Sequence, residues 1–309
     1  MRLSLTILFA TGSLIAQGPP PPGRGGQQPT GPTAQLYSGE TTKVSDHVWV
    51  MSGNPNIAII VGSRGTLVVD TGLGAPNGDV VARTALKLSA PGAKQYLTTT
   101  HFHPEHAAGE PGFPGSTILI RNRVQQQEWE KNGVSMVDMF AGMGATQTQW
   151  LSNRTFRAPD VLFEDEVKID LGGVTARLLW YGGGHTKGDE LTFAEPDDTL
   201  VSGDIVQNKV VPSIFGDGGT PASWVAVLDK VAQLPVKHVI PDHSAPGDGS
   251  LVTAERNFIA DLRTRALDLK KQGKSAQEAA TQINTEFRAK YPDWRNLNVS
   301  MFVQSIYAE

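Results

Sequence analysis

Four residues with metal-binding side chains fall within six positions of this chain, in the segment HFHPEH that begins at residue 101. In an extended backbone His101 and His103 point to the same side, so both imidazoles can bind one ion. The chain must turn after Pro104, which directs Glu105 and His106 toward a second ion. Neutral imidazole suits zinc and a carboxylate suits a harder ion, so this spacing indicates a metal site.

Two further histidines and an aspartate follow predicted strands elsewhere in the chain. His185 lies in GGGHTKGDE, His243 in IPDHSAPG and Asp204 in LVSGDIV. Strand ends are places where a rigid sheet holds side chains and where loops leave room for a substrate. Five of the seven histidines therefore cluster in three short segments, and we expect only His47 and His238 to be structural.

The chain has 309 residues and no cysteine, which narrows the chemistry of such a site. Disulfides, a cysteine nucleophile, thiolate-bound zinc and iron–sulfur clusters are excluded, so the metal ligands must be His, Asp or Glu. The formal net charge of −4 is unfavourable for binding nucleic acid. We expect a small-molecule substrate as partner, and the sequence does not indicate an oligomeric state.

The N-terminal segment is expected to lie outside the folded domain. Residues 1–16, MRLSLTILFATGSLIA, have a positive start and a short apolar run, which is the pattern of a secretory signal peptide. This run is too short to span a membrane, which takes about 20 apolar residues. Residues 17–35 contain six Pro and five Gly, which predicts a disordered or polyproline II tether. We therefore expect export to the periplasm or beyond, with no membrane span.

The remaining residues read as strands, then mixed elements, then helices. Apolar alternation and helical spacing predict strands within 36–70, at 96–100, within 161–206 and at 238–241, and helices at 78–89, at 121–132, from Thr220 and within 251–309. Residues 133–159 are expected to be irregular. Their Met and aromatic side chains make them a candidate substrate lid, with packing in the core as the alternative.

Taken together, five short motifs resemble the metallo-β-lactamase superfamily of hydrolases. In the order of the family they are VVDTG (68–72), HFHPEH (101–106), GGGHTKGD (182–189), SGD (202–204) and PDH (241–243). The resemblance implies an α/β fold, namely a four-layer αββα sandwich with a metal site at one edge. Together with the N-terminal patterns, it divides the chain into a signal peptide (1–16), a tether (17–35), the metallo-β-lactamase-like domain (36–250) and a C-terminal helical extension (251–309).

The resemblance also implies two metal ions, with zinc expected and iron or manganese as alternatives. Water bound to such ions loses a proton near neutral pH and becomes a nucleophile, which the bridging aspartate would orient. The implied ligands form two groups with a bridge: His101, His103 and His185 for the first ion, Glu105, His106 and His243 for the second, and Asp204 between them.

Two positions depart from the pattern of the family. Glu105 stands where the family usually has Asp, so it is either a longer ligand or a free base that accepts a proton from the nucleophile. Asp242 stands where many relatives have Gly, and it either tunes His243 through a hydrogen bond or faces solvent. Asp70 is expected to orient a ligand imidazole or to cap its own turn, and Asp189 to support the ligands from outside or to lie at the surface.

The expected activity is hydrolysis of an ester, lactone, thioester or β-lactam bond by a metal-activated hydroxide. The missing cysteine removes one large group of β-lactamases, which use cysteine as a ligand of the second ion, while export keeps β-lactams among the substrates. A phosphodiesterase acting on nucleic acid fits poorly with the acidic balance. Two alternatives stand, a mononuclear iron oxidoreductase of the persulfide dioxygenase type and a non-catalytic metal-binding module.

Overall fold

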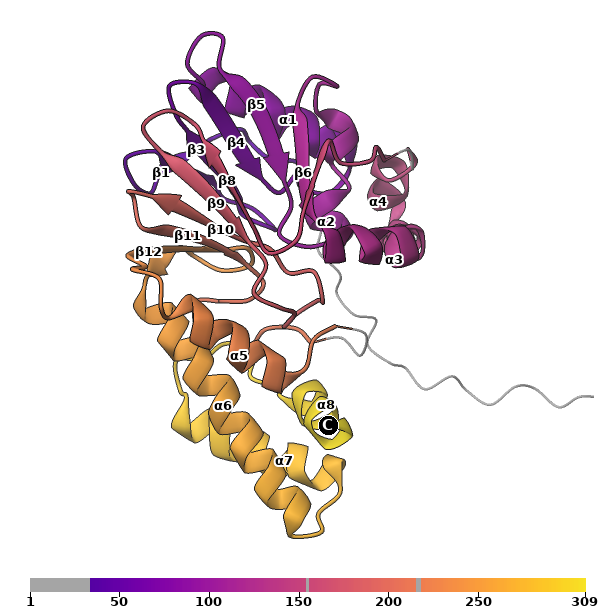
Figure 1. The fold of residues 1–309 in the computed structure, drawn as a ribbon. Coiled ribbons are helices and arrows are strands. Elements are labelled where there is room, and N and C mark those ends of the chain that lie inside the picture. Colours follow the sequence, from indigo (N-terminus) through magenta and orange to yellow (C-terminus); the bar gives the residue numbers. More distant parts are fainter. Residues whose placement is uncertain (1–33, 154–155, 215–217) are drawn as a thin grey trace, which may run out of the picture. The chain divides into compact units, whose positions relative to one another are not determined.

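Two β-sheets stack face to face in the computed structural model, which describes residues 34–153, 156–214 and 218–309 (Figure 1). The sheets have the strand orders β1-β2-β3-β4-β5-β6-β7 and β13-β12-β11-β10-β9-β8. The signal peptide and residues 17–33 of the tether lie outside the described residues, so both stay predictions. The strands of the first sheet are β1 (Thr42–Lys43), β2 (Val48–Met51), β3 (Ile57–Val61), β4 (Gly65–Val69), β5 (Lys94–Thr98), β6 (Ile118–Asn122) and β7 (Val161–Phe163). Those of the second are β8 (Glu166–Asp170), β9 (Thr175–Leu179), β10 (Leu191–Glu195), β11 (Thr199–Gly203), β12 (His238–Pro241) and β13 (Gly247–Asp248).

The central strand β4 shows why the sheets carry apolar side chains on both faces. Successive side chains of a strand point to opposite faces. Leu67 and Val69 therefore belong to the cluster between the two sheets, while Val68 belongs to the cluster beneath helix α1 (Gly74–Leu88). Every residue of β4 is buried, which explains why Leu67, Val68 and Val69 follow one another without a polar residue between them.

Helices cover the outer face of the second sheet as well, which completes four layers. Helix α5 (Pro221–Val231) buries Trp224 and Leu228 against Phe193 and Leu200 of β10 and β11. Figure 1 shows α5 and α6 beside this sheet and α1 beside the first. The αββα sandwich and the C-terminal helices predicted from the sequence are thus confirmed.

Two of the helices begin at residues that cap their first turn. Thr220 caps α5 with Pro221 in its first turn, and Ser275 and Glu278 form a capping box at the start of α7. The C-terminal helices pack in the same apolar cluster as α5. The remaining helices are α2 (Pro104–Ala107), the 3₁₀ turn η1 (Glu110–Gly112), α3 (Arg123–Ala141), α4 (Ala145–Trp150), α6 (Ser250–Lys271), α7 (Ala276–Lys290) and α8 (Ser300–Ala308).

The prediction that residues 133–159 are irregular is wrong for most of the segment. Helix α3 continues to Ala141 and α4 follows it. Val137 and Phe140 are buried with Phe102 in one apolar cluster, so this part of the chain packs in the core, which was the alternative to a lid. Gly133 interrupts the helical pattern in the sequence, but it lies against the Trp129 ring, where a Cβ atom would come within 3.1 Å.

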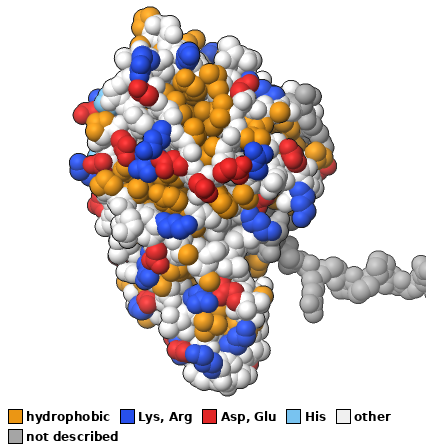
Figure 2. All heavy atoms as spheres, viewed as in Figure 1, with side chains coloured by type: hydrophobic (Ala, Val, Ile, Leu, Met, Phe, Trp, Pro, Cys, Tyr) orange, Lys and Arg blue, Asp and Glu red, His pale blue; other side chains and the backbone are white. Residues whose placement is uncertain are grey.

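The surface agrees with the balanced composition of the chain. Figure 2 shows basic and acidic side chains interspersed over the face that it presents. None of the described helices combines the length and apolar character that crossing a bilayer requires.

Candidate metal centre

The predicted metal ligands converge although they come from both sheets. His101 and His103 follow β5 of the first sheet, and His106 lies in α2 directly after them. The other three histidine and aspartate ligands belong to the second sheet, where each follows a strand: His185 after β9, Asp204 after β11 and His243 after β12. The edge where these strands end therefore brings together every ligand that the sequence singled out.

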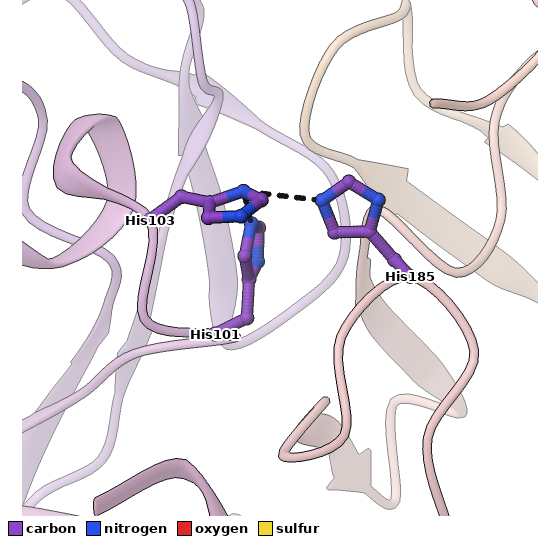
Figure 3. Close-up of side chains that lie close together, drawn as sticks. All are labelled: His101, His103 and His185. Carbon is purple, nitrogen blue, oxygen red and sulfur yellow. Dashed lines mark hydrogen bonds between the residues drawn. The ribbon is translucent and has the colours of Figure 1, made fainter. Parts of the chain in front are cut away.

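The first ligand group consists of three buried imidazoles. Nε2 of His101 lies 3.0 Å from Nδ1 of His103, and Nε2 of His185 lies 3.2 Å from the same atom. Figure 3 shows His101 and His103 meeting His185 from the opposite side. Two ring nitrogens bound to one tetrahedral zinc ion, each at 2.0–2.1 Å, lie about 3.4 Å apart, so the three nitrogens are spaced for a single ion.

The second ligand group lies beside the first. Nε2 of His106 is 3.2 Å from Nε2 of His243, and Oε1 of Glu105 is 3.9 Å from Nε2 of His106. These three atoms lie within 4.8 Å of one another. The Glu105 side chain therefore points into the site, although it is one methylene longer than the usual aspartate.

Asp204 faces both groups with different oxygens. Its Oδ2 atom lies 3.2 Å from Nε2 of His185, and its Oδ1 atom lies 3.2 Å from Nε2 of His243. A carboxylate in this position can contribute one oxygen to each of two ions. This arrangement fits a two-metal site with a bridging aspartate.

A buried carboxylate oxygen without a hydrogen-bond partner supports the fit of these residues to metal ions. Oε2 of Glu105 is buried and has no hydrogen-bond partner among the described residues. A buried carboxylate oxygen without a partner is costly, and a bound cation removes that cost. The donor set of imidazoles and carboxylates is the one that zinc and similar divalent ions prefer.

Burial and neighbouring charges prepare the ligands for metal binding. Burial lowers the pKa of His101 and His103 well below the usual range, which keeps these imidazoles neutral and able to bind an ion. Although burial alone raises the pKa of Asp204, the surrounding histidines hold it at about 2. Burial raises the pKa of Glu105 to about 7.

Two aspartates orient His106. Asp70 lies with Oδ2 2.9 Å from Nδ1 of His106, as expected for a residue that fixes a ligand imidazole. The expectation for Asp242 is wrong on both of its alternatives, because this side chain is fully buried and its Oδ2 lies 3.2 Å from Nδ1 of His106. Strand β12 ends at Pro241, and the bend that follows it directs Asp242 to His106 and brings His243 to the second ligand group.

Asp189 supports the loop that carries His185. It accepts hydrogen bonds from the backbone amides of Gly184 at 2.8 Å and Thr186 at 3.0 Å, and from the Thr186 hydroxyl at 2.6 Å. The carboxylate thus fixes the backbone on both sides of the histidine. This agrees with a supporting role and not with a place at the surface.

Several polar partners of the ligands are not evident from the sequence. Nδ1 of His185 lies 2.8 Å from the carbonyl oxygen of Ser213, which leaves Nε2 free of its proton and directed into the site. Nδ1 of His243 contacts Oδ1 of Asn54. The asparagine precedes this histidine by 189 residues in an irregular loop, where no periodic pattern could mark it.

A cavity of about 450 Å³ adjoins Asp204 and His243. Its described lining contains no residue of 133–153 or 156–159, so the lid predicted from the sequence does not border it. The described walls come instead from residues 207–214 and from the C-terminal segment 296–302. The two remaining histidines lie outside the ligand groups, since His47 contacts Asp197 at 2.7 Å and His238 begins β12.

Known proteins share this architecture. A sec-alkylsulfatase structure and its double mutant, the former from Pseudomonas sp., match with TM-scores of 0.61 and 0.63 at 18% identity, and cover 78% of this chain and 44–45% of theirs. A metallo-beta-lactamase from Pontibacter korlensis matches with a TM-score of 0.55 at 20% identity, covering 72% of this chain and 98% of its own.

A curated sequence relative is the linear primary-alkylsulfatase of Pseudomonas sp. (strain ATCC 19151), which is 24% identical over 266 residues. The match covers 73% of this chain but 49% of the relative, so the chain spans about half the length of that enzyme. The model of the metallo-beta-lactamase superfamily matches residues 51–243, which is more than half of the chain and contains both ligand groups. The chain therefore belongs to the metallo-beta-lactamase superfamily, whose members are metal-dependent hydrolases.

Proposed function

We propose that this protein is a two-metal hydrolase that cleaves an ester, lactone, thioester or β-lactam bond. One observation carries the proposal: the two oxygens of Asp204 each lie 3.2 Å from a histidine of a different ligand group. A single-ion site needs no such bridge, so the geometry favours two ions over the mononuclear iron alternative. Bound metal ions would supply Lewis acidity and lower the pKa of water, so that a nucleophile is available near neutral pH.

The roles of the residues follow from their positions. The five imidazoles would hold the ions, and Asp204 would bridge them and orient the nucleophile. We assign Glu105 as a ligand of the second ion, because its buried Oε2 atom has no hydrogen-bond partner among the described residues. Asp70 and Asp242 would keep Nε2 of His106 directed into the site.

Sulfate esters form a second candidate substrate class. The curated relative is named a linear primary-alkylsulfatase, and two matching structures are of a sec-alkylsulfatase. At 24% identity and about half the length of the relative, this resemblance is a reason to test alkyl sulfates beside carboxylic esters. We also propose that the signal-like sequence 1–16 exports the enzyme, which cell fractionation can test.

The test combines metal content with turnover. Wild-type protein loaded with zinc should hold two ions per chain and hydrolyse at least one member of a panel of esters, thioesters, lactones, β-lactams and alkyl sulfates. His103→Ala should lose the first ion. Removing a hydrogen-bond partner of a metal ligand lowers activity roughly 10- to 100-fold, and removing the ligand His103 itself should lower it further. His238→Ala is the matched control, because this histidine belongs to neither ligand group.

The outcomes separate the alternatives. Unchanged activity in His103→Ala contradicts the proposal. One iron ion per purified chain would favour the oxidoreductase, and zinc uptake without turnover of any panel member would favour a metal-binding module. Glu105→Asp tests the assignment of Glu105. A ligand role predicts that the variant keeps both its two ions and its activity, whereas a free base predicts lost activity with unchanged metal content.

A further inference from the structure

The cavity beside Asp204 combines apolar side chains with neutral polar ones, and the apolar side chains come from the loop 210–214 and from α8. One wall consists of the loop residues Val210, Val211, Pro212 and Ile214, and Met301 and Phe302 of α8 face it. Among the described lining residues, the only charged or ionisable side chains are the two metal ligands Asp204 and His243.

The remaining lining offers neutral polar groups. The side chains of Gln207, Ser213, Asn296 and Asn298 complete the described surface. A charged substrate tail would find no opposite charge among these residues and would lose its hydration, which is unfavourable. An apolar tail would gain from leaving water, and a volume of about 450 Å³ lies in the ordinary range of small-molecule sites.

The C-terminal wall is part of the fold and not a loose contact. Val210 pairs with Arg295 in a parallel bridge, where the Arg295 amide donates to the Lys209 carbonyl at 2.9 Å. This bridge fixes the segment of Asn296 against the loop that forms the opposite wall. The spacing of the two walls is therefore set by backbone hydrogen bonding.

The same wall connects to the metal ligands through aromatic packing. The Phe302 ring lies 5.7 Å from the Trp224 ring, and the Trp224 ring lies 6.2 Å from that of His185, measured between centroids. Trp224 and Phe302 are buried, with 0% and 1% of their surface exposed. Helix α8 thus stands at a fixed position relative to the first ligand group.

We propose that this cavity binds an apolar acyl or alkyl chain of the substrate, with residues of the C-terminal segment determining specificity. The scissile bond would then lie at Asp204 and His243, at the inner end of the bound acyl or alkyl chain. The identification of this ligand as a substrate rests on the proposed hydrolase function, whereas the affinity for an apolar chain does not.

Binding can be measured without turnover by comparing decanoate with acetate in calorimetric titrations of the full-length, zinc-loaded protein. Both probes carry the same carboxylate, so a difference in affinity reports on the chain. Each buried methylene is worth about fourfold in affinity, and we expect decanoate to bind at least tenfold more tightly than acetate. Equal affinities would overturn the proposal.

Met301 allows a sharp test because 56% of its surface is exposed, so substitution should leave the fold intact. Met301→Glu should reduce decanoate affinity at least fivefold, because it places a carboxylate beside the apolar part of the bound decanoate. Met301→Leu should retain the affinity. Met139→Glu is the matched control, since Met139 is 50% exposed on α3 and does not line the cavity. An equal loss in both glutamate variants would contradict the assignment.

A substrate series distinguishes acyl from alkyl chains. Para-nitrophenyl esters from acetate to decanoate and linear alkyl sulfates of matching lengths should be compared by kcat/KM. A rise with chain length in either series supports the cavity and identifies the bond. Turnover that is independent of chain length in both overturns the inference but leaves the hydrolase proposal standing. Selective decanoate binding without turnover of any substrate supports the cavity inference but contradicts the hydrolase proposal.

Discussion

The side-chain amide of Gln207 donates a hydrogen bond to Asp204, with 3.2 Å between Nε2 and Oδ1. The Gln207 backbone amide in turn donates to Oε2 of the buried Glu255 on α6 at 3.1 Å, and its Oε1 accepts from the Ser244 hydroxyl at 2.8 Å. The glutamine is thus held at three points. It fixes the Asp204 carboxylate, which faces both ligand groups.

Gln207→Met tests this relationship, because methionine keeps the length of the side chain but cannot donate to Asp204. We expect kcat/KM to fall about 10- to 100-fold, the range for loss of an outer partner of a metal ligand. Competition with a chromophoric chelator should show weaker metal binding. The control Gln233→Met changes an exposed glutamine outside the site, and it should leave kcat/KM and metal affinity unchanged.

Asp70→Asn should weaken the second ion selectively. The Asp70 carboxylate lies 2.9 Å from Nδ1 of His106 and also accepts from the Thr100 amide at 2.7 Å. The neutral amide keeps the shape but loses the charge that makes the imidazole a better ligand. After dialysis we expect close to one ion per chain instead of two. Asp46→Asn, at a side chain that is 92% exposed, serves as control, and equal metal content in both variants would exclude this role.

The Glu190→Gln variant should gain stability relative to the wild type as the pH rises. Burial raises the pKa of Glu190 to about 8 in the folded protein, whereas an exposed glutamate has a pKa of 4.5. Between these values the folded state binds more protons than the unfolded state, so the wild type loses stability with rising pH, by at most about 1.4 kcal/mol per pH unit. Glutamine does not titrate, so the stability of the variant does not fall for this reason.

Urea unfolding of wild type and Glu190→Gln at pH 6 and pH 8 measures the effect as a difference between the two proteins. The free energy of unfolding of the variant should gain on that of the wild type at the higher pH. The exposed Glu40→Gln provides the control. A difference that is the same at both pH values would show that Glu190 does not titrate in this range.

Chelation should lower the melting temperature reversibly. Ions that bind only the folded chain stabilise it by about 2.7 kcal/mol at a hundredfold excess over Kd. For a domain of this size that corresponds to roughly 5–10 °C. Differential scanning calorimetry with and without EDTA measures the shift, and re-addition of zinc should restore it. His103→Ala should show a smaller shift than wild type, and an equal shift would place the stabilising ion elsewhere.

Many of the strands could be predicted because their sequence pattern is periodic, whereas their arrangement in two stacked sheets was implied by the resemblance to the metallo-β-lactamase superfamily. Val174, Ala176 and Leu178 alternate with polar residues, as a strand with one buried face requires, and the structure places Ala176 and Leu178 in the core between the sheets. Helix α3 was predicted too short, because Gly133 and the polar residues around it resemble a helix end. Its packing on Trp129 depends on tertiary contacts that local pattern does not reveal.

The ligands could be singled out because rare residue types stand at fixed spacing, whereas their partners could not. Asp242 was expected beside His243, its neighbour in sequence, but it lies against His106. Asn54 and Ser213 are common residue types in loops that only the folded chain brings to the site. The chemistry of a ligand is visible in the sequence, but the choice of its hydrogen-bond partner depends on packing.

The position of the ligands at the seam of the two sheets has a consequence for the order of folding. His103 and His185 are separated by 82 residues, and His106 and His243 by 137. Neither ligand group is complete within one sheet, so a partly folded chain with a single formed sheet offers only fragments of a chelate. High-affinity metal uptake should therefore be a late event. Its rate, followed with a chromophoric chelator during refolding, would time the docking of the sheets.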